Sequence, residues 1–491
     1  MATDPHTPSA ALGYLGIGDV LARFEDGTLT SAGLVDVLLQ RIAVVDAPNG
    51  PVGLRAVAAV ADDARAVADA RDAERARGQV RGPLHGVPVM VKDNIEVTGL
   101  PGAAGSTALV GRPASDAPLV ARLRAAGAVV LGSTSLSAWA NIRSARSTSG
   151  WSATNGLVGN PWALDRSAGG SSSGSGAALA AGLVPGAVGT ETDGSIVCPA
   201  SLTGVVGLKP TVGAVPTAGI VPISASQDSA GPMGRSVDDV ARLFAVLADR
   251  VPAAPEPHAT RFVHAATWRT GHPGTDAVVE GFVDALRASG ATVEARAVAP
   301  AGPGVVDDEF QVMLAEFVDD LDAYLAARPG AGVRSLADVV AFEDAHAEVE
   351  LPWFGHELFV QALGTGGRAG GAYATSRART LDWAVGTCLG PGIEGAHVLI
   401  APAYGPAWKS DLAVGGHGAA VSSWVTTPAA IAGWPIMSVP VGLVHGLPVG
   451  LALIARPGEE WVLLGAARQV EAVVASVAPL PRPGWVPPGR G

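Results

Sequence analysis

Residues 169–195 read GGSSSGSGAALAAGLVPGAVGTETDGS, a serine and glycine loop, an apolar run, and a second loop that ends Asp193-Gly194-Ser195. Small residues let the backbone approach a substrate closely and let several N–H groups turn toward one point. A flexible linker has a similar composition, but the run from Ala177 to Val188 is almost wholly apolar and fits only a core. We therefore expect a pinned and buried loop of the kind that builds an oxyanion site.

Two other loop motifs are excluded around this stretch. The segment from Gly170 to Gly174 formally fits the G-x-S-x-G nucleophile elbow, but that motif needs an apolar strand just upstream. The segment from Asn160 to Arg166 contains a proline and two charges instead. A phosphate-binding loop is excluded because no Gly-Lys-Ser/Thr follows the glycines.

The composition indicates a compact enzyme with a large core. A length of 491 residues corresponds to about three domains or to one large α/β unit. Hydrophobic residues make up 48% and charged residues 16%, with many glycines and prolines for tight turns. The net charge is -12 and no basic run occurs, so we expect no nucleic-acid partner.

The remaining compositional features concern the compartment. Cys198 and Cys388 are too few for a disulfide framework or a cysteine zinc site, which predicts a reducing, cytoplasmic location. The N-terminus lacks the pattern of a signal peptide, and no uninterrupted apolar run reaches the length of a membrane span. We expect a soluble protein with no membrane contact, no metal and no cofactor, and the oligomeric state stays open.

The hydrophobic pattern predicts an N-terminal helical cover over residues 1–80 and a catalytic domain over 81–480. Thr30 or Ser31 can cap a first helix, and an alanine-rich helix follows from Leu54 to about Arg77. A strand then ends at Lys92, and a helix and a second strand follow in β-α-β order.

This order predicts an α/β fold with a large mixed, mostly parallel β-sheet covered by helices on both faces. Further apolar runs predict strands at 397–402, 438–441 and 449–454, and Ser236 opens a helix. The helical stripe between Asp307 and Leu325 favours core packing. Residues 330–395 are less regular, and we expect the region 300–400 to shape a variable substrate pocket.

A serine hydroxyl is a poor nucleophile until a base takes its proton. None of the ten histidines lies in a recognisable triad context, and His85 is best explained as a turn or packing residue. Lysine can replace histidine where burial keeps the amine neutral.

Three motifs supply such a combination: Gly86-Val-Pro-x-x-Val-Lys92-Asp93, Gly169-Gly-Ser171-Ser172 and Gly189-Thr-Glu-Thr-Asp-Gly194-Ser195. Together they resemble the amidase signature family, including its spacing of 24 residues between two serines. The resemblance covers about residues 30–475 and extends through Ser226-Gln-Asp228. It implies that Ser195 is the acyl-forming nucleophile, Ser171 the bridging serine and Lys92 the terminal base.

The same resemblance implies an oxyanion hole made by the backbone N–H groups of Thr192, Asp193, Gly194 and Ser195, and a cis peptide bond before Ser171. Ser173 and Asp193 depart from the family pattern, because many members have glycine at both positions. Neither position supplies a reacting side chain.

The segment from Gly189 to Ala200 looks most similar to bacterial peptide amidases, which implies release of ammonia from C-terminal carboxamides of peptides or acylated amino acids. Apolar residues of the variable region predict hydrophobic flanking groups on the substrate: Trp353, Phe354, Leu358 and Phe359.

Other functions stay open beside this one. The same motifs also resemble those of a subunit of a tRNA-dependent amidotransferase. Two features weigh against this alternative: the acidic net charge suits tRNA poorly, and Ser423 stands where those subunits have an acidic residue that holds glutamine. An amidase for aryl amides or carbamoyl compounds is a further alternative. A non-catalytic binding protein is disfavoured because all three catalytic positions are filled.

Overall fold

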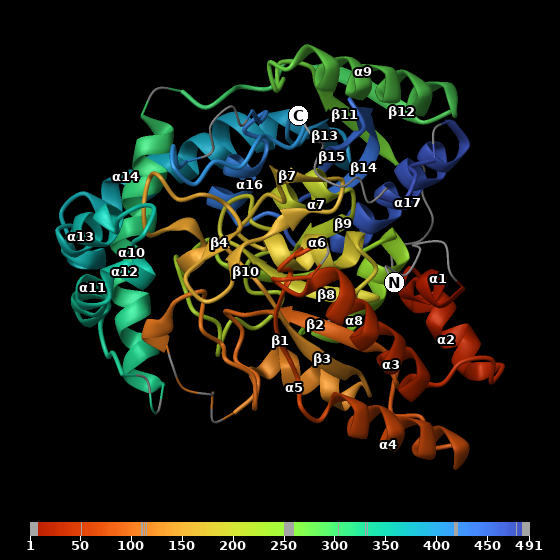
Figure 1. Cartoon of the computed structure of the whole chain (residues 1–491). Coiled ribbons are helices and arrows are strands. Elements are labelled where there is room, and N and C mark those ends of the chain that lie inside the picture. The colour runs from red at the N-terminus through yellow and green to blue at the C-terminus, as the bar shows by residue number, and fades with distance from the viewer. Residues whose placement is uncertain are drawn as a thin grey trace.

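The computed structural model describes residues 8–50, 52–109, 111, 113, 115–249, 260–302, 304–328, 330, 332–416, 421–477 and 479–483. An 11-stranded sheet crosses the centre of the molecule in the order β1-β3-β2-β8-β10-β9-β14-β15-β13-β11-β12 (Figure 1). Its strands are β1 Val57–Val60, β2 Pro88–Lys92, β3 Val129–Thr134, β8 Gly186–Glu191, β9 Val206–Lys209, β10 Ser229–Gly234, β11 Arg261–Ala265, β12 Thr292–Arg296, β13 Val398–Pro402, β14 Ile436–Val444 and β15 Leu447–Ile454. Two small ribbons pair β4 Trp151–Ser152 with β5 Gly156–Leu157 and β6 Gly159–Asn160 with β7 Ala163–Ser167.

The predicted mixed sheet is confirmed, but the prediction that it is mostly parallel is wrong. Parallel pairing is confined to β3-β2-β8 and to β13-β11-β12, and the other neighbours are antiparallel. The reason is visible between β14 and β15, where the two-residue turn His445-Gly446 joins the strands directly. Such a short connection permits only antiparallel pairing, whereas parallel strands need a long crossover.

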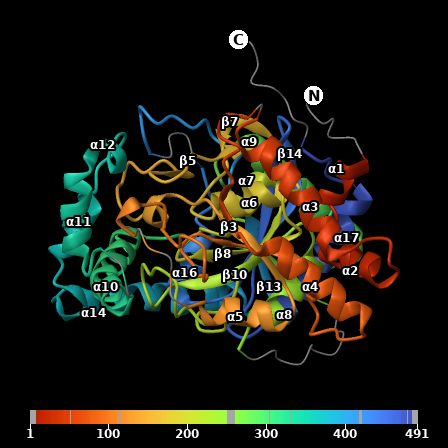
Figure 2. The same ribbon diagram turned by 60° about the horizontal axis from the view of Figure 1, so that its bottom comes forward.

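The helices surround this sheet (Figures 1 and 2). Their bounds are α1 Pro8–Gly13, α2 Ile17–Glu25, α3 Ser31–Arg41, α4 Ala64–Ala76, α5 Pro118–Ala125, α6 Ser173–Ala180, α7 Val197–Thr203, α8 Val237–Leu247, α9 Pro273–Ala288, α10 Val305–Ala327, α11 Leu336–Ala345, α12 Ala347–Glu350, α13 Glu357–Leu363, α14 Tyr373–Leu381, α15 Gly390–Gly392, α16 Thr426–Ala432 and α17 Glu460–Val477. Short π-helical or 3-10 turns occupy Ile42–Asp46, Thr107–Leu109, Ala138–Asn141, Gly367–Ala369 and Asp382–Leu389.

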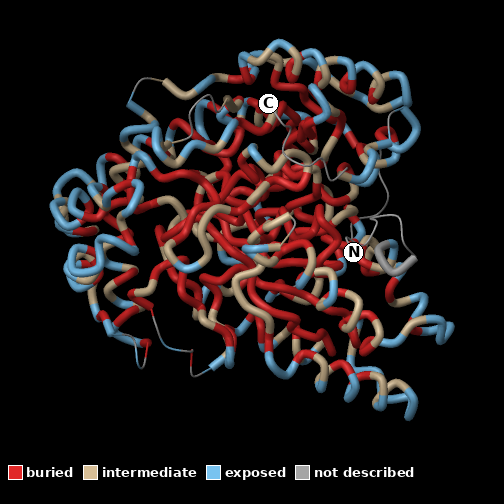
Figure 3. Tube along the Cα trace, in the orientation of Figure 1, coloured by how far each residue is buried: buried red, intermediate tan, exposed pale blue. Residues whose placement is uncertain are grey.

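The sheet carries helices on both faces, as predicted. Gly186 of β8 faces Leu243 of α8, whereas Gly189 of the same strand faces Ser172, just before α6. Positions three apart on a strand point to opposite faces, so α6 and α8 lie on different sides. In Figure 3 the buried residues fill the middle of the molecule and the exposed ones follow its outer helices.

The N-terminal segment differs from the predicted helical cover. Thr30 caps α3 as expected, with its hydroxyl accepting the Gly33 N–H at 3.0 Å. The second helix, however, begins at Ala64, because the residues just before it form β1, which pairs with β3. Gly132 of β3 permits this pairing, since a Cβ there would lie 2.2 Å from the Ala59 carbonyl oxygen. Tertiary pairing therefore overrides the helical propensity of this alanine-rich stretch.

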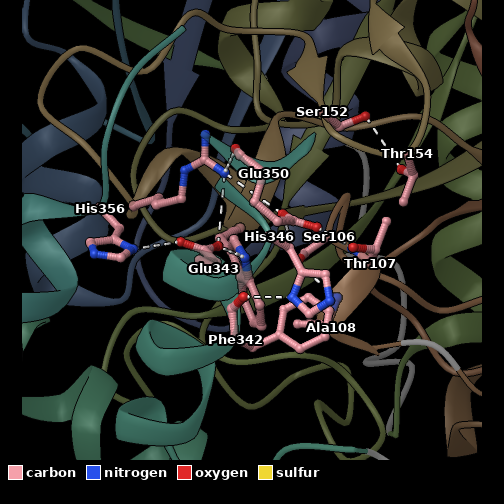
Figure 4. A network of polar contacts seen from close by, with 12 residues as sticks. Ser106, Thr107, Ala108, Ser152, Thr154, Phe342, Glu343, His346, Glu350 and His356 are labelled. Atoms are coloured by element: carbon pink, nitrogen blue, oxygen red, sulfur yellow. Dashed lines mark hydrogen bonds and ion pairs between the residues drawn. The ribbon is translucent and has the colours of Figure 1, made fainter. Parts of the chain in front are cut away.

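The region expected to be irregular is mostly helical, from α11 to α15. A buried polar network attaches it to the loop after β3 (Figure 4). The Arg143 guanidinium donates to the Glu350 carbonyl oxygen at 2.7 Å and lies 3.8 Å from the Glu343 carboxylate. Glu343 in turn accepts the Trp139 indole N–H at 2.9 Å and contacts His356 at 3.0 Å. This network fixes the turn at Trp139 against the outer helices.

None of the helices in the described part of the chain combines the length and the apolar character needed to cross a bilayer.

The close packing of α6 against the sheet gives a first prediction. A methyl group at Gly174 would lie 2.3 Å from the Ala56 carbonyl oxygen and 2.5 Å from that of Ser135. Because both are backbone atoms, Gly174→Ala should destabilise the protein by about 1–3 kcal/mol or more, seen as a lower thermal-unfolding midpoint. Gly281→Ala in α9 is the matched control, because a Cβ there meets open space and alanine favours a helix by about 1 kcal/mol. An unchanged midpoint for Gly174→Ala would contradict this packing.

Candidate active site

The site lies where two parallel strands end side by side. Strands β2 and β8 run parallel with Val91 opposite Val188, so their carboxyl ends meet at one edge of the sheet. Ligands of α/β sheets bind outside the carboxyl ends of such strands. Lys92 is the last residue of β2, and Thr190 lies near the end of β8.

The Lys92 amino group contacts the serine and glycine loop and the end of β8. Its Nζ lies 2.7 Å from Ser171 Oγ, 2.8 Å from Thr190 Oγ1 and 3.2 Å from the Thr190 carbonyl oxygen. Asn94 holds the threonine hydroxyl from another side, with a hydrogen bond of 3.0 Å. The lysine side chain has no exposed surface, so these are its polar partners.

Burial lowers the pKa of Lys92 to about 7. Removal from water penalises the charged ammonium, and the negative charges of Asp228 and Glu191 oppose that effect only in part. A large fraction of the amine is therefore neutral near pH 7 and can accept a proton from Ser171.

The serine and glycine loop is pinned and buried, as predicted. The Ser172 hydroxyl donates to the Thr190 carbonyl oxygen at 3.0 Å, and the Ser172 N–H donates to the Ser195 carbonyl oxygen at 3.1 Å. The Gly170–Ser171 peptide bond is cis. Ser173, one of the two departures from the family pattern, donates its hydroxyl to the Gly169 carbonyl oxygen and opens α6.

The loop after β8 presents free N–H groups beside Ser195. Among the described residues, the N–H groups of Thr192, Asp193, Gly194 and Ser195 have no backbone acceptor. The Glu191 carboxylate accepts the next two N–H groups along the chain, at 2.6 and 2.9 Å, which fixes the end of the turn. Gly194 has φ 77, and a Cβ there would lie 2.5 Å from the Tyr404 hydroxyl. This turn therefore offers donors to an oxyanion.

The side chains around the turn hold it in place. Asp193 directs its carboxylate away toward Thr427, whose hydroxyl donates to it at 2.9 Å. Thr192 donates its hydroxyl to Asp228 at 2.6 Å. The other carboxylate oxygen of Asp228 accepts the N–H groups of Ile223 and Ser224, at 2.8 and 3.0 Å. Asp228 thus joins the turn to a second loop.

Two cavities lie beside this turn. The cavity that Ser195 lines has a volume of about 550 Å³. The cavity around Ser171 has a volume of about 400 Å³ and is also lined by Thr190, and Thr192 lines both cavities. Within the described part of the chain, the hydroxyls of Ser171 and Ser195 form no direct hydrogen bond. The wall of the cavity around Ser195 is largely apolar and aromatic: Ile142, Ile223, Phe310, Met313, Tyr404, Trp408, Val421 and Trp424.

No group of three or more histidine, cysteine or acidic side chains within the described ranges is arranged to hold a metal ion.

A model of the family described as Amidase matches residues 34–464. This protein belongs to the amidase family. It is an enzyme that hydrolyses the C–N bond of amides, and its fold agrees with solved members of that family.

The peptide amidase PAM, solved with the competitive inhibitor chymostatin, is 40% identical to this amidase with a TM-score of 0.88, and the match covers 96% of this chain and 99% of that one. The native peptide amidase from Stenotrophomonas maltophilia is 40% identical with a TM-score of 0.87, covering 96% and 98%. A glutamyl-tRNA(Gln) amidotransferase subunit of Symbiobacterium thermophilum is 35% identical over 469 residues, covering 90% of this chain and 93% of its own length. A probable amidase of Arabidopsis thaliana is 39% identical over 375 residues, 72% of each chain.

The structure corrects the predicted pocket residues of this amidase. Trp353 is exposed, and Phe354, Leu358 and Phe359 pack into a core cluster, so none of the four lines the cavity around Ser195. Two members of the helical stripe assigned to the core, Phe310 and Met313, line that cavity instead. Both are only half-buried.

Sequence reasoning also missed the role of Asp228, although this residue lies in one of the motifs that carry the family resemblance. An acidic residue within a neutral loop is the signal that could have indicated it, because a buried carboxylate needs several hydrogen-bond donors.

The contacts of Asp228 give a second prediction for this amidase. Thr192→Val removes the hydrogen bond between the turn 192–195 and Asp228, and Asp228→Asn weakens it because a neutral amide replaces the charged acceptor. In both variants kcat should fall roughly 10²-fold because small misplacements of the site are costly. Only Asp228→Asn also removes the negative charge that raises the pKa of Lys92. Its acidic limb in a pH–rate profile should therefore move to lower pH, while that of Thr192→Val should stay in place. Identical limbs for the two variants would contradict this electrostatic link.

Proposed function

We propose that this amidase hydrolyses C-terminal carboxamides of peptides or acylated amino acids through an acyl-enzyme on Ser195. The observation that carries the proposal is the buried Lys92 amine, 2.7 Å from Ser171 and beside a turn of unpaired N–H groups. The two peptide amidase structures at 40% identity support the substrate class.

In the acylation step, Ser195 Oγ attacks the carboxamide carbon while its proton passes to Ser171 Oγ, and the Ser171 proton passes to the neutral Lys92 amine. Hydrogen bonds of this kind are often long without substrate and tighten when it binds. The N–H groups of Thr192, Asp193, Gly194 and Ser195 stabilise the negative oxygen of the tetrahedral intermediate, and loss of one donor from such a site costs about 3–4 kcal/mol.

The collapse of this intermediate needs an acid, because an amide anion is too basic to leave unaided. The Lys92 ammonium returns a proton through Ser171 to the departing nitrogen, which leaves as ammonia. A water molecule then attacks the acyl-enzyme while the same relay takes its proton. The carboxylic acid product leaves, and Ser195 regains its proton.

The apolar wall around Ser195 supports a preference for hydrophobic flanking groups over free glutamine, with Phe310 and Met313 of α10 in place of the residues first expected. We assign the substrate pocket of the variable region to this helix. The division between a segment 1–80 and a catalytic domain 81–480 stays a prediction. A cytoplasmic location and the lack of a nucleic-acid partner also stay predictions. The location is inferred from the two cysteines, and both of these are free thiols.

The amidotransferase alternative draws support from relatives at 35% identity. Ser423 stands where the amidotransferase subunits are expected to have an acidic residue for glutamine. Its hydroxyl donates to the Pro402 carbonyl oxygen and its side chain is buried. With the net charge of -12, this favours hydrolysis of small amides over action on charged tRNA. Aryl amides and carbamoyl compounds remain alternative substrates.

The proposed base predicts the pH dependence of the reaction. Protonated Lys92 cannot accept a proton, so kcat/KM should fall tenfold for each pH unit below about 7 and reach a plateau above it. Lys92→Arg keeps a positive charge that is never lost, and its activity should be lower by about 10²–10⁴-fold at every pH. A flat profile for the wild type, or an active Lys92→Arg variant, would refute the relay.

The proposed nucleophile predicts a single site of covalent labelling. A serine-directed phosphonate should attach to Ser195, because this serine lies on the turn whose N–H groups have no backbone acceptor among the described residues. Mass spectrometry of the digested protein measures the position of the label. Ser195→Ala should fold normally and take up no label, whereas a label on Ser171 or Ser172 would reject the assignment.

The substrate class is tested by ammonia release under identical conditions from acetyl-phenylalaninamide and from glutamine. We expect faster release from the blocked amide, because the cavity wall is apolar. Faster release from glutamine would favour the amidotransferase function. Release from neither would point to an aryl amide or a carbamoyl compound.

A further inference from the structure

A separate hollow adjoins the cavity around Ser195. It has a volume of about 360 Å³. We call the cavity around Ser195 the first cavity and the separate hollow the second cavity. Ser422 lines the first, Ser423 lines the second, and Trp424 lines both. The two hollows are therefore divided by a single turn of the chain.

Trp424 stands out on this dividing turn. Its surface is 58% exposed, although it is among the largest apolar side chains. Its backbone has φ 60, in the left-handed region that a bulky residue rarely adopts. Such conformations persist where the surrounding structure enforces them and are concentrated at binding sites. Tryptophan is also the residue type most enriched where a few contacts dominate binding.

The second cavity has an aromatic and apolar wall. Trp268 and Trp383 contribute their rings and are nearly buried, at 5% and 9% exposure. Proline, alanine and valine side chains complete most of the surface: Pro300, Ala301, Val306 and Pro428. Among the described residues of this wall, Arg269 alone carries a charge, and it is paired with Glu280 at 2.6 Å.

We propose that the second cavity is a subsite for an apolar or aromatic side chain of the peptide, located upstream of the residue whose carboxamide is cleaved. This inference rests on the proposed function. The occupant follows from continuity: a carboxamide held at Ser195 leaves the rest of the peptide in the first cavity, and that cavity adjoins the second across Trp424. An extended peptide advances about 3.3–3.6 Å per residue, so the residues upstream of the carboxamide carry their side chains away from Ser195 and toward the dividing turn.

The wall also sets a preference among side chains. Aromatic rings pack well against Trp268, Trp383 and Trp424 in edge-to-face or offset geometry. A lysine or arginine side chain would lose hydration in an apolar hollow, and the described residues of its wall offer no carboxylate to pair with the charge. The subsite therefore selects phenylalanine or leucine over basic residues.

The experiment compares kcat/KM for acetyl-phenylalaninamide with that for acetyl-Phe-Ala-Phe-amide and acetyl-Lys-Ala-Phe-amide. For the wild type, kcat/KM should be about tenfold higher for the aromatic tripeptide than for the single-residue amide. For the lysine peptide, kcat/KM should be close to that for the single-residue amide. Trp424→Ala should bring the ratio of the first two rates close to one. Trp353→Ala is the matched control, because this tryptophan is 44% exposed and lines neither cavity; its ratio should equal that of the wild type.

A second variant fills the cavity instead of removing its wall. Gly302 lines the second cavity, and a Cβ there meets nothing within 4 Å, so Gly302→Phe should occupy the hollow and abolish the gain for the aromatic tripeptide. Gly371→Phe is its control, since that glycine also faces open space and lines neither cavity.

A ratio near one in the wild type, or a ratio that neither Trp424→Ala nor Gly302→Phe changes, would overturn the subsite while the proposed function stands. If the wild type hydrolyses none of the three carboxamides, the proposed function itself fails and the subsite with it. The two failures are therefore distinguishable.

Discussion

The structure depends on one constraint, the burial of the Lys92 amine between the serine and glycine loop and the end of β8. Lys92 has no exposed surface and its amine contacts Ser171 and Thr190. Burial suits the group to the role of base that we propose, because a solvated lysine is almost fully protonated at neutral pH. The chain has only three lysines, Lys92, Lys209 and Lys409, and two of them are fully buried. Lys409 lies within 3.9 Å of Asp165 in an exposed ion pair. An arginine could not replace Lys92 because a guanidinium does not lose its proton.

The rest of the fold holds the partners of this amine. Parallel strands β2 and β8 place the ends of two loops together, and the small residues of α6 let its first turn approach the sheet. The second buried lysine is Lys209. Burial lowers its pKa to about 8, and the negative charges of Glu191 and Asp193 oppose that effect in part. These two acids would otherwise be buried without a nearby positive charge, which is costly. The turn 192–195 is thus held by the hydrogen bonds of Thr192 and Asp193, and the buried negative charges beside it are balanced by Lys209.

The local pattern of the sequence predicted much of this arrangement. The strand that ends at Lys92, the buried loop at Ser171 and the late strands near residues 398 and 449 follow from apolar runs bounded by turn residues. Long-range pairing was less accessible. The stretch at Leu54 looks helical by composition and becomes a strand because β3 offers a glycine opposite it. The residues of the cavity wall were not predicted for a related reason. A helical stripe indicates which face of a helix is apolar, but it does not indicate that Phe310 and Met313 of that face line a cavity.

The central claim is that Lys92 is neutral at the pH at which the enzyme works, and lysine NMR tests it most directly. With lysine labelled by ¹³C and ¹⁵N, the chain gives only three side-chain signals, and the one missing from a Lys92→Met variant is that of Lys92. We expect a titration midpoint near pH 7 for this signal. A midpoint at about pH 10, the value of an exposed lysine, would show a charged amine and would contradict the account.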